Sequence, residues 1–193
     1  MAKKAIRAWH FLADKDGKPV LRDGSPAPKI GEKLTVKPPL VICSHGLHAS
    51  IRPIDALEYS PGPWACLVEC GGEIVREPDK LCCSERTIIG MVDATRVLQY
   101  FACDCAAMAI ETDLDANQEL WLAVDMKLAW LDGLCSDDDL AAARAAAWDA
   151  ARAAAWDAAR AAAWAAARDA ARDAENEYLE EMLLDAIGGG RSQ

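Results

Sequence analysis

The chain has 193 residues, 52% of them apolar, and a formal net charge of −10. This length suits one domain with an appendage, and no apolar run approaches the roughly 20 residues that a membrane-spanning helix needs. The acidic balance argues against sequence-specific DNA binding through a broad basic face, and the N-terminus leads into no hydrophobic signal segment, which predicts a cytoplasmic protein.

The distribution of charge and the cysteine spacing limit the partners and the metal sites that we expect for this protein. Residues 1–40 carry nine basic and four acidic side chains, which leaves 12 basic and 27 acidic ones in the remainder. We therefore expect no membrane partner and no nucleic-acid partner. The eight cysteines form no C-x-x-C pair. Without a secretion signal they are expected to be free and mostly buried, and we expect no metal site.

The N-terminal half has the pattern of short strands. Alternating side chains over 5–12 predict the first strand, and turns at Asp16-Gly17 and Asp23-Gly24 flank a second one at 19–21. Residues 25–39 hold four prolines and predict a loop with at most a short strand at 34–36. The apolar run 40–43 is a candidate buried strand, and Pro53 is placed to begin a short helix that ends near Tyr59.

Farther along, the periodicity changes from strands to helices. Residues 64–70 and 73–76, joined by Gly71-Gly72, resemble a β-hairpin, and 81–83 and 86–89 predict one or two further strands. From Asp93 apolar side chains recur at helical spacing in two segments, the second of which is closed by Gly133.

The last segment predicts one long helix from Ser136 to Gly188. It is rich in alanine, contains no internal glycine or proline, and begins with three aspartates after a serine N-cap. An arginine or tryptophan recurs every fourth residue, which gives a row of candidate interaction residues: Trp148, Arg152, Trp156, Arg160 and Trp164. Either the rest of the chain covers these tryptophans or a partner helix does, in a homo-oligomer or in a target protein.

These elements predict an α+β fold, in which a small, mainly antiparallel β domain with short helices precedes C-terminal helices. We expect a β-rich domain over 1–92 and two amphipathic helices packed on it over 93–134. The long Ala/Trp/Arg-rich helix then occupies 135–188, and 189–193 form a flexible tail.

Two family resemblances bear on function. The stretch Cys-Ser-His-Gly-Leu-His-Ala at 43–49, then Pro-Ile-Asp-Ala-Leu-Glu-Tyr at 53–59, Gly-Glu-Ile-Val at 72–75 and Asp-Lys-Leu at 79–81, resembles an uncharacterised domain family of phage and prophage proteins. The resemblance covers roughly residues 3–95. It implies a mobile-element origin and no particular activity.

A second resemblance, to ADP-ribosyltransferases, rests on four residues in order: His10, His48 within Gly46-Leu47-His48-Ala49, Tyr59, and Glu85. The resemblance implies that the two histidines hold the nicotinamide ribose of NAD and that Tyr59 stacks on nicotinamide. Glu85 would stabilise the positive charge that develops as the glycosidic bond breaks. This chain departs from the family pattern after His10, where Phe11-Leu12 replaces a small pair, and in the short spacing from Tyr59 to Glu85.

The sequence therefore favours a phage or prophage accessory protein that acts through protein–protein contact, directed at a host or defence factor. Its partner, a target protein or further copies of itself, binds the C-terminal helix, and no cofactor is needed. One alternative is an NAD-dependent ADP-ribosyltransferase, so whether the chain is an enzyme stays open. Another is an oligomeric structural or virion-associated protein.

Overall fold

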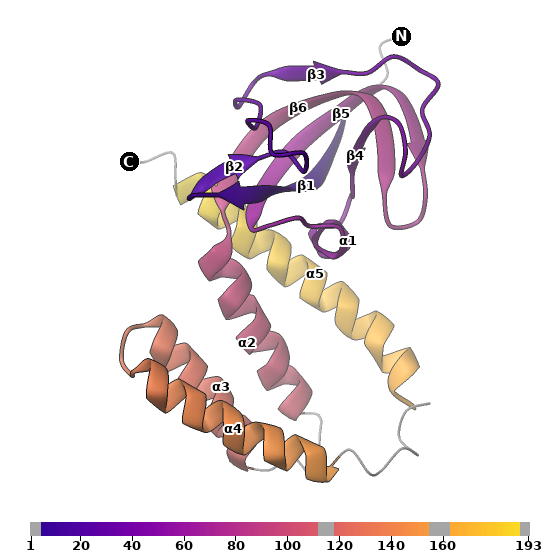
Figure 1. Cartoon of the computed structure of the whole chain (residues 1–193). Helices are drawn as coiled ribbons and strands as arrows, with labels where there is room; N and C mark the ends of the chain where they lie inside the picture. Colours follow the sequence, from indigo (N-terminus) through magenta and orange to yellow (C-terminus); the bar gives the residue numbers. More distant parts are fainter. Residues whose placement is uncertain (1–4, 112–117, 155–162, 190–193) are drawn as a thin grey trace. The chain divides into compact units, whose positions relative to one another are not determined.

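The computed structural model describes residues 5–111, 118–154 and 163–189. The fold is α+β, as predicted: an antiparallel half-barrel sheet lies on the N-terminal side of the chain, and helices follow it (Figure 1). The chain divides into two compact units, one made of residues up to Thr95 together with those from Glu175 onward, and the other of Arg96–Ala174. Each unit is described by itself.

Six antiparallel strands build the first unit. They are β1 (Ile6–Lys15), β2 (Lys18–Val20), β3 (Lys33–Thr35), β4 (Leu47–Ala49), β5 (Trp64–Arg76) and β6 (Leu81–Asp93). The strand order is β2-β1-β5-β6-β3, and β4 pairs with β6 outside this path. Ser50, directly after β4, exchanges two backbone hydrogen bonds with Trp9 of β1, at 2.7 and 2.9 Å. β4 thus links the two ends of the curved β1-β5-β6 segment.

Side-chain alternation gives the sheet an inner and an outer face. Ala8 and Leu12 of β1 belong to the apolar core together with Cys66 and Val68 of β5. Successive side chains of a strand point to opposite faces, so His10 shares the inner face with Ala8 and Leu12, whereas Trp9 points outward. The inner face therefore combines an apolar core with a polar position at His10.

The C-terminal part of α5 (Ala163–Gly189) covers the outer face (Figure 1). Leu179 and Leu183 are fully buried, and the indole Nε1 of Trp9 donates a hydrogen bond to Glu180 Oε1 at 3.2 Å. Gly90 of β6 leaves room for Ile187, since a Cβ at this glycine would lie 2.7 Å from Ile187 Cγ2. Residues 175–189 are thus part of the core of the first unit.

Three helices precede α5 after the sheet: α2 (Thr95–Glu111), α3 (Gln118–Leu131) and α4 (Asp137–Ala154). The turn between α3 and α4 has Gly133 at φ 72°, and the Leu134 N–H donates to Ala129 O at 2.7 Å. The predicted N-cap is confirmed, because Ser136 Oγ accepts from the Asp139 N–H and the Asp139 carboxylate accepts from the Ser136 N–H. No helix among the described residues has the length and apolar character needed to cross a membrane.

Two strand predictions are wrong. Residues 40–43 form a turn with Val41 half exposed and Cys43 at φ 64°, because only the Val41–His45 bridge pairs this segment. Gly71-Gly72 does not reverse the chain: β5 runs through it with a register irregularity, and the reversal comes at 77–80. Gly72, at φ 71°, provides a bulge in place of the predicted hairpin turn.

The prediction of one continuous helix over 136–188 falls partly on residues 155–162, which lie outside the described residues. On either side of them the chain is helical in α4 and α5. The predicted domain boundaries at 92, 134 and 188 stay a prediction.

Candidate functional site

The first unit contains a cavity of about 460 Å³ between β1, β4, the 41–46 turn and α1 (Pro53–Glu58). Pro53 begins α1 at its first position, where the absent N–H removes no helical bond. The short helix brings Tyr59, which follows it directly, to the cavity wall. A segment that the sequence places far from β1 thus meets it in space.

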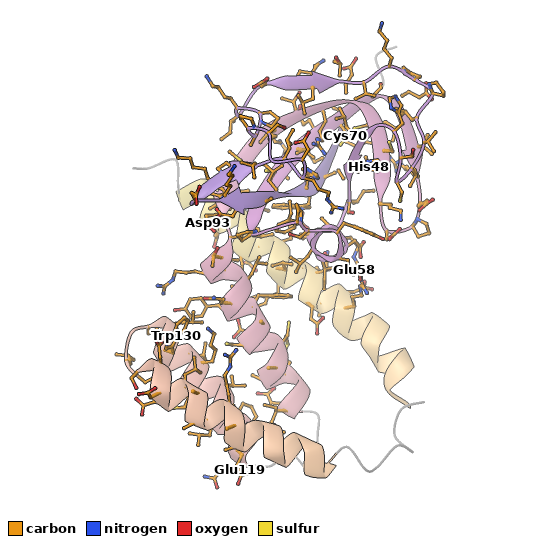
Figure 2. All side chains as sticks on the ribbon, in the orientation of Figure 1. His48, Glu58, Cys70, Asp93, Glu119 and Trp130 are labelled. Carbon is orange, nitrogen blue, oxygen red and sulfur yellow. The ribbon has the colours of Figure 1, made fainter. Side chains whose placement is uncertain are left out.

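Three of the four residues of the ADP-ribosyltransferase resemblance line this cavity: His10 from β1, His48 from β4 and Tyr59 after α1. Figure 2 labels His48 on β4. Glu85 does not line the cavity. Its carboxylate pairs with Lys33 Nζ of β3 at 2.9 Å, and both side chains are largely exposed. Because neighbouring residues of a strand face opposite ways, Arg86 lines the cavity in place of Glu85.

Arg86 is the residue that sequence reasoning missed. Only 5% of it is exposed. Its Nη1 donates to the backbone O of His48, and its Nε has no hydrogen-bond partner. No carboxylate of the described chain forms an ion pair with it. Burial lowers the pKa of Arg86, but an arginine titrates so far above neutrality that the guanidinium stays charged. The sequence offers no clear signal for it, because Arg86 lies in the polar stretch Ser84-Glu85-Arg86-Thr87.

Cysteine thiols surround Arg86 without neutralising it. Burial raises the pKa of Cys66 to about 12, so this thiol stays protonated at pH 7. A hydrogen bond with Cys83 and burial also raise the pKa of Cys70. That hydrogen bond lowers the pKa of Cys83, yet Cys83 Sγ donates to Leu47 O at 3.3 Å, as a neutral thiol does. All eight cysteines are free, and five of them are buried.

The two histidines are neutral at pH 7. Burial, followed by the positive charge of Arg86, lowers the pKa of His10 well below its usual value and lowers that of His48 as well. The Nε2 of His48 accepts a hydrogen bond from the Cys43 N–H at 2.9 Å, so its proton is on Nδ1. The remaining ring N–H of His48 donates to the backbone of Gly46, so His48 is held by the 43–46 turn, and His10 is the imidazole that can donate an N–H into the cavity.

Tyr59 lies at the mouth of the cavity among charged side chains. Its hydroxyl donates to Asp79, which raises the pKa of Tyr59, and Lys80 Nζ lies 4.9 Å from the centre of its ring. Its backbone O accepts a hydrogen bond from Arg22 Nη2 at 2.7 Å. Arg22 and Lys80 both line the cavity, and no aspartate or glutamate does. In a protein with a net charge of −10, this cavity has a lining of positive charge only.

The candidate interaction residues of the C-terminal helix fall mostly outside the part of the chain that the structure describes. Trp156 and Arg160 lie outside the described residues, and so do the side chains of Trp148, Arg152 and Trp164. Their role in binding a partner stays a prediction. No group of three or more His, Cys, Asp or Glu side chains among the described residues is arranged to hold a metal ion.

Residues 22–100 match the family model of a domain of unknown function, DUF7666. The matched stretch includes Arg22, His48, Tyr59, Lys80 and Arg86, so it contains most of the cavity's polar lining. The matched stretch does not include β1 or His10. The description of the family assigns no activity to it. No curated protein and no solved structure matches the chain. The phage origin and the ADP-ribosyltransferase resemblance stay predictions.

Proposed function

We propose that the first unit binds a small anionic molecule in the cavity lined by Arg86. The observation that carries this proposal is the buried guanidinium of Arg86, which has an unsatisfied Nε and no carboxylate partner in the described part of the chain. Burying an unpaired charge costs several kcal/mol, and native proteins seldom keep one without a role for it. An anionic ligand supplies the missing counter-charge.

The remaining lining supports the same ligand class. Arg22 and Lys80 add positive charge at the mouth, and the neutral imidazole of His10 adds an N–H donor. Hydrogen bonds from charged donors to an anion are about twice as strong as those between neutral groups. Because Arg86 itself is buried, its attraction for an anion is screened less by salt than that of a surface arginine.

A thermal unfolding series with inorganic phosphate, sulfate and acetate, compared with chloride at constant ionic strength, tests the proposal. A ligand that binds only the folded state raises the midpoint as its concentration exceeds the dissociation constant. We expect a saturable rise for at least one of these anions. Arg86→Met removes the rise, and Lys33→Met, which changes a basic residue outside the cavity, keeps it. Equal effects of all salts on all three proteins would refute anion binding.

A second candidate is ADP-ribose transfer from NAD. The observation in its favour is that His10, His48 and Tyr59 line one cavity. The residues present do not complete a transfer site, because Glu85 pairs with Lys33 outside the cavity and no other acid replaces it. Release of nicotinamide from NAD by the protein, abolished by Glu85→Gln, would establish the transferase. We expect no release from either protein.

A further inference from the structure

We propose that the ligand of this cavity is a small phosphomonoester: a dianionic phosphate attached to one compact, uncharged organic group. The inference rests on the anion-binding function proposed above and names the class of anion.

The first argument is the number of uncompensated charges. Arg86 has no acidic partner, and the Nη2 of Arg22 is bonded to a neutral carbonyl, Tyr59 O. Lys80 differs, because its Nζ lies 3.2 Å from the carboxylate of Glu77. Among the described residues, no carboxylate pairs with either the buried Arg86 or the exposed Arg22. A phosphomonoester carries about −1.5 to −2 at pH 7 and matches both, whereas a monocarboxylate matches one.

The second argument is the supply of hydrogen-bond donors. A phosphate has three terminal oxygens, each a strong acceptor. Besides Arg86, the lining offers the ring N–H of His10 and the hydroxyl of Ser44. These three residues can each bind a different terminal oxygen of a phosphate.

The third argument is size and polarity. A cavity of about 460 Å³ is toward the small end of the range of about 300–1,000 Å³ typical of small-molecule sites. Part of its wall is apolar, contributed by Phe11, Leu21, Leu47 and Ala56. Among the described residues, no aspartate or glutamate lines the cavity to bind a cationic substituent. One compact uncharged group matches this volume and this apolar wall.

Calorimetric titration of the full chain tests this inference with a panel of defined probes. The panel contains glycerol 3-phosphate, ribose 5-phosphate and adenosine 5′-monophosphate, the methyl phosphodiester of each, inorganic phosphate, succinate, benzoate and NAD. We expect at least one monoester to bind at least about tenfold more tightly than inorganic phosphate and than its own diester, which carries one charge fewer. Arg22→Gln is expected to reduce this preference for the monoester over the diester, and Lys33→Met to leave it unchanged.

The outcomes separate the two proposals. Tighter binding of a carboxylate or of NAD than of every monoester overturns the phosphomonoester inference and leaves anion binding intact. Equal affinity for monoester and diester also overturns it, because the second charge then contributes nothing. Binding of no probe, together with no effect of Arg86→Met on any anion, overturns both.

Discussion

Arg86 and Glu85 are neighbours on β6, and their side chains lie in different environments. Glu85 lies on the outer side of β6 and pairs with Lys33 in solvent, where an ion pair contributes about 0–1 kcal/mol. Arg86, one residue later, is buried with an unsatisfied Nε. The sequence could predict a strand here. Which of the two side chains faces inward depends on the strand register, which has two irregularities between β5 and β6.

The first prediction concerns the stability of Arg86→Met. Methionine fills similar space without a charge, so the variant loses one hydrogen bond to His48 O and is relieved of a buried unpaired group. An unsatisfied buried polar group costs about 1–3 kcal/mol, so we expect the free energy of unfolding to rise by about 1 kcal/mol while anion binding is lost. Urea denaturation measures the first quantity. A loss of more than about 2 kcal/mol would mean that Arg86 holds the fold together instead.

The second prediction concerns His10 and pH. The unfolded chain protonates this histidine below about pH 6.5, but the folded chain does not, because burial and Arg86 lower its pKa. The stability contribution is complete above pH 6.5 and is lost as pH falls toward the lowered pKa of the folded state. One proton gives a slope of at most about 1.4 kcal/mol per pH unit.

Urea denaturation between pH 7 and pH 5 measures this slope. We expect His10→Gln to flatten it and His45→Gln, which changes an exposed histidine, to leave it as in the parent. A slope that is identical in the parent and in His10→Gln would show that His10 does not stay neutral in the folded protein.

At the scale of elements, α5 explains why the sheet does not need a second layer of strands. Its residues 175–189 place Leu179, Leu183 and Ile187 on the outer face, at i, i+4 and i+8 spacing. The helical period of this segment could be predicted from the sequence. Its docking could not, because the alanine-rich sequence before it fits a solvent-exposed or partner-bound rod equally well.

The third prediction tests this docking with two neighbouring leucines. Leu183 is fully buried, whereas Leu184 is 43% exposed. We expect Leu183→Ala to lower the free energy of unfolding by about 2–5 kcal/mol and Leu184→Ala to change it by less than about 1 kcal/mol. Denaturation monitored by tryptophan fluorescence gives both values. Equal, small effects of the two changes would show that α5 does not cover the sheet in solution.

The fourth prediction concerns Gly46, which precedes β4 at φ 132°. A Cβ there would lie 2.2 Å from Cys82 Sγ, so any side chain forces either Cys82 or the backbone that leads into β4 and His48 to shift. We expect Gly46→Ala to weaken phosphate binding at least about tenfold. Gly24→Ala, at a positive φ with open space around it, is the matched control for backbone strain alone. An equal loss of phosphate affinity in Gly46→Ala and Gly24→Ala would show that the loss comes from backbone strain and not from a change at the cavity, which contradicts the prediction.

At the scale of the whole molecule, the chain returns to its first unit after a helical excursion. Residues from Glu175 onward pack with residues up to Thr95, and Arg96–Ala174 form a unit of their own. The predicted α+β class is confirmed. The sequence could not show that the last helix rejoins the sheet, since hydrophobic periodicity identifies an apolar face but not the surface that covers it.

The fifth prediction follows from this return. A chain ending at Ala174 loses the helix segment that contacts Trp9 and packs Ile187 against Gly90, so we expect it to aggregate or to unfold at a markedly lower temperature. A chain ending at Gly189 is the control and behaves like the parent. If the chain ending at Ala174 stays folded and monodisperse by light scattering, the sheet does not depend on α5.

We propose that the buried guanidinium of Arg86 binds an anion. Nuclear magnetic resonance of its side-chain Nε–H tests this binding most directly. In protein labelled with ¹⁵N at arginine, assigned by the signal missing from Arg86→Met, the Arg86 Nε–H should be observable because it is buried. We expect inorganic phosphate to shift this signal saturably, with the same dissociation constant as calorimetry gives. A signal that does not move while phosphate binds, or no binding at all, would contradict it.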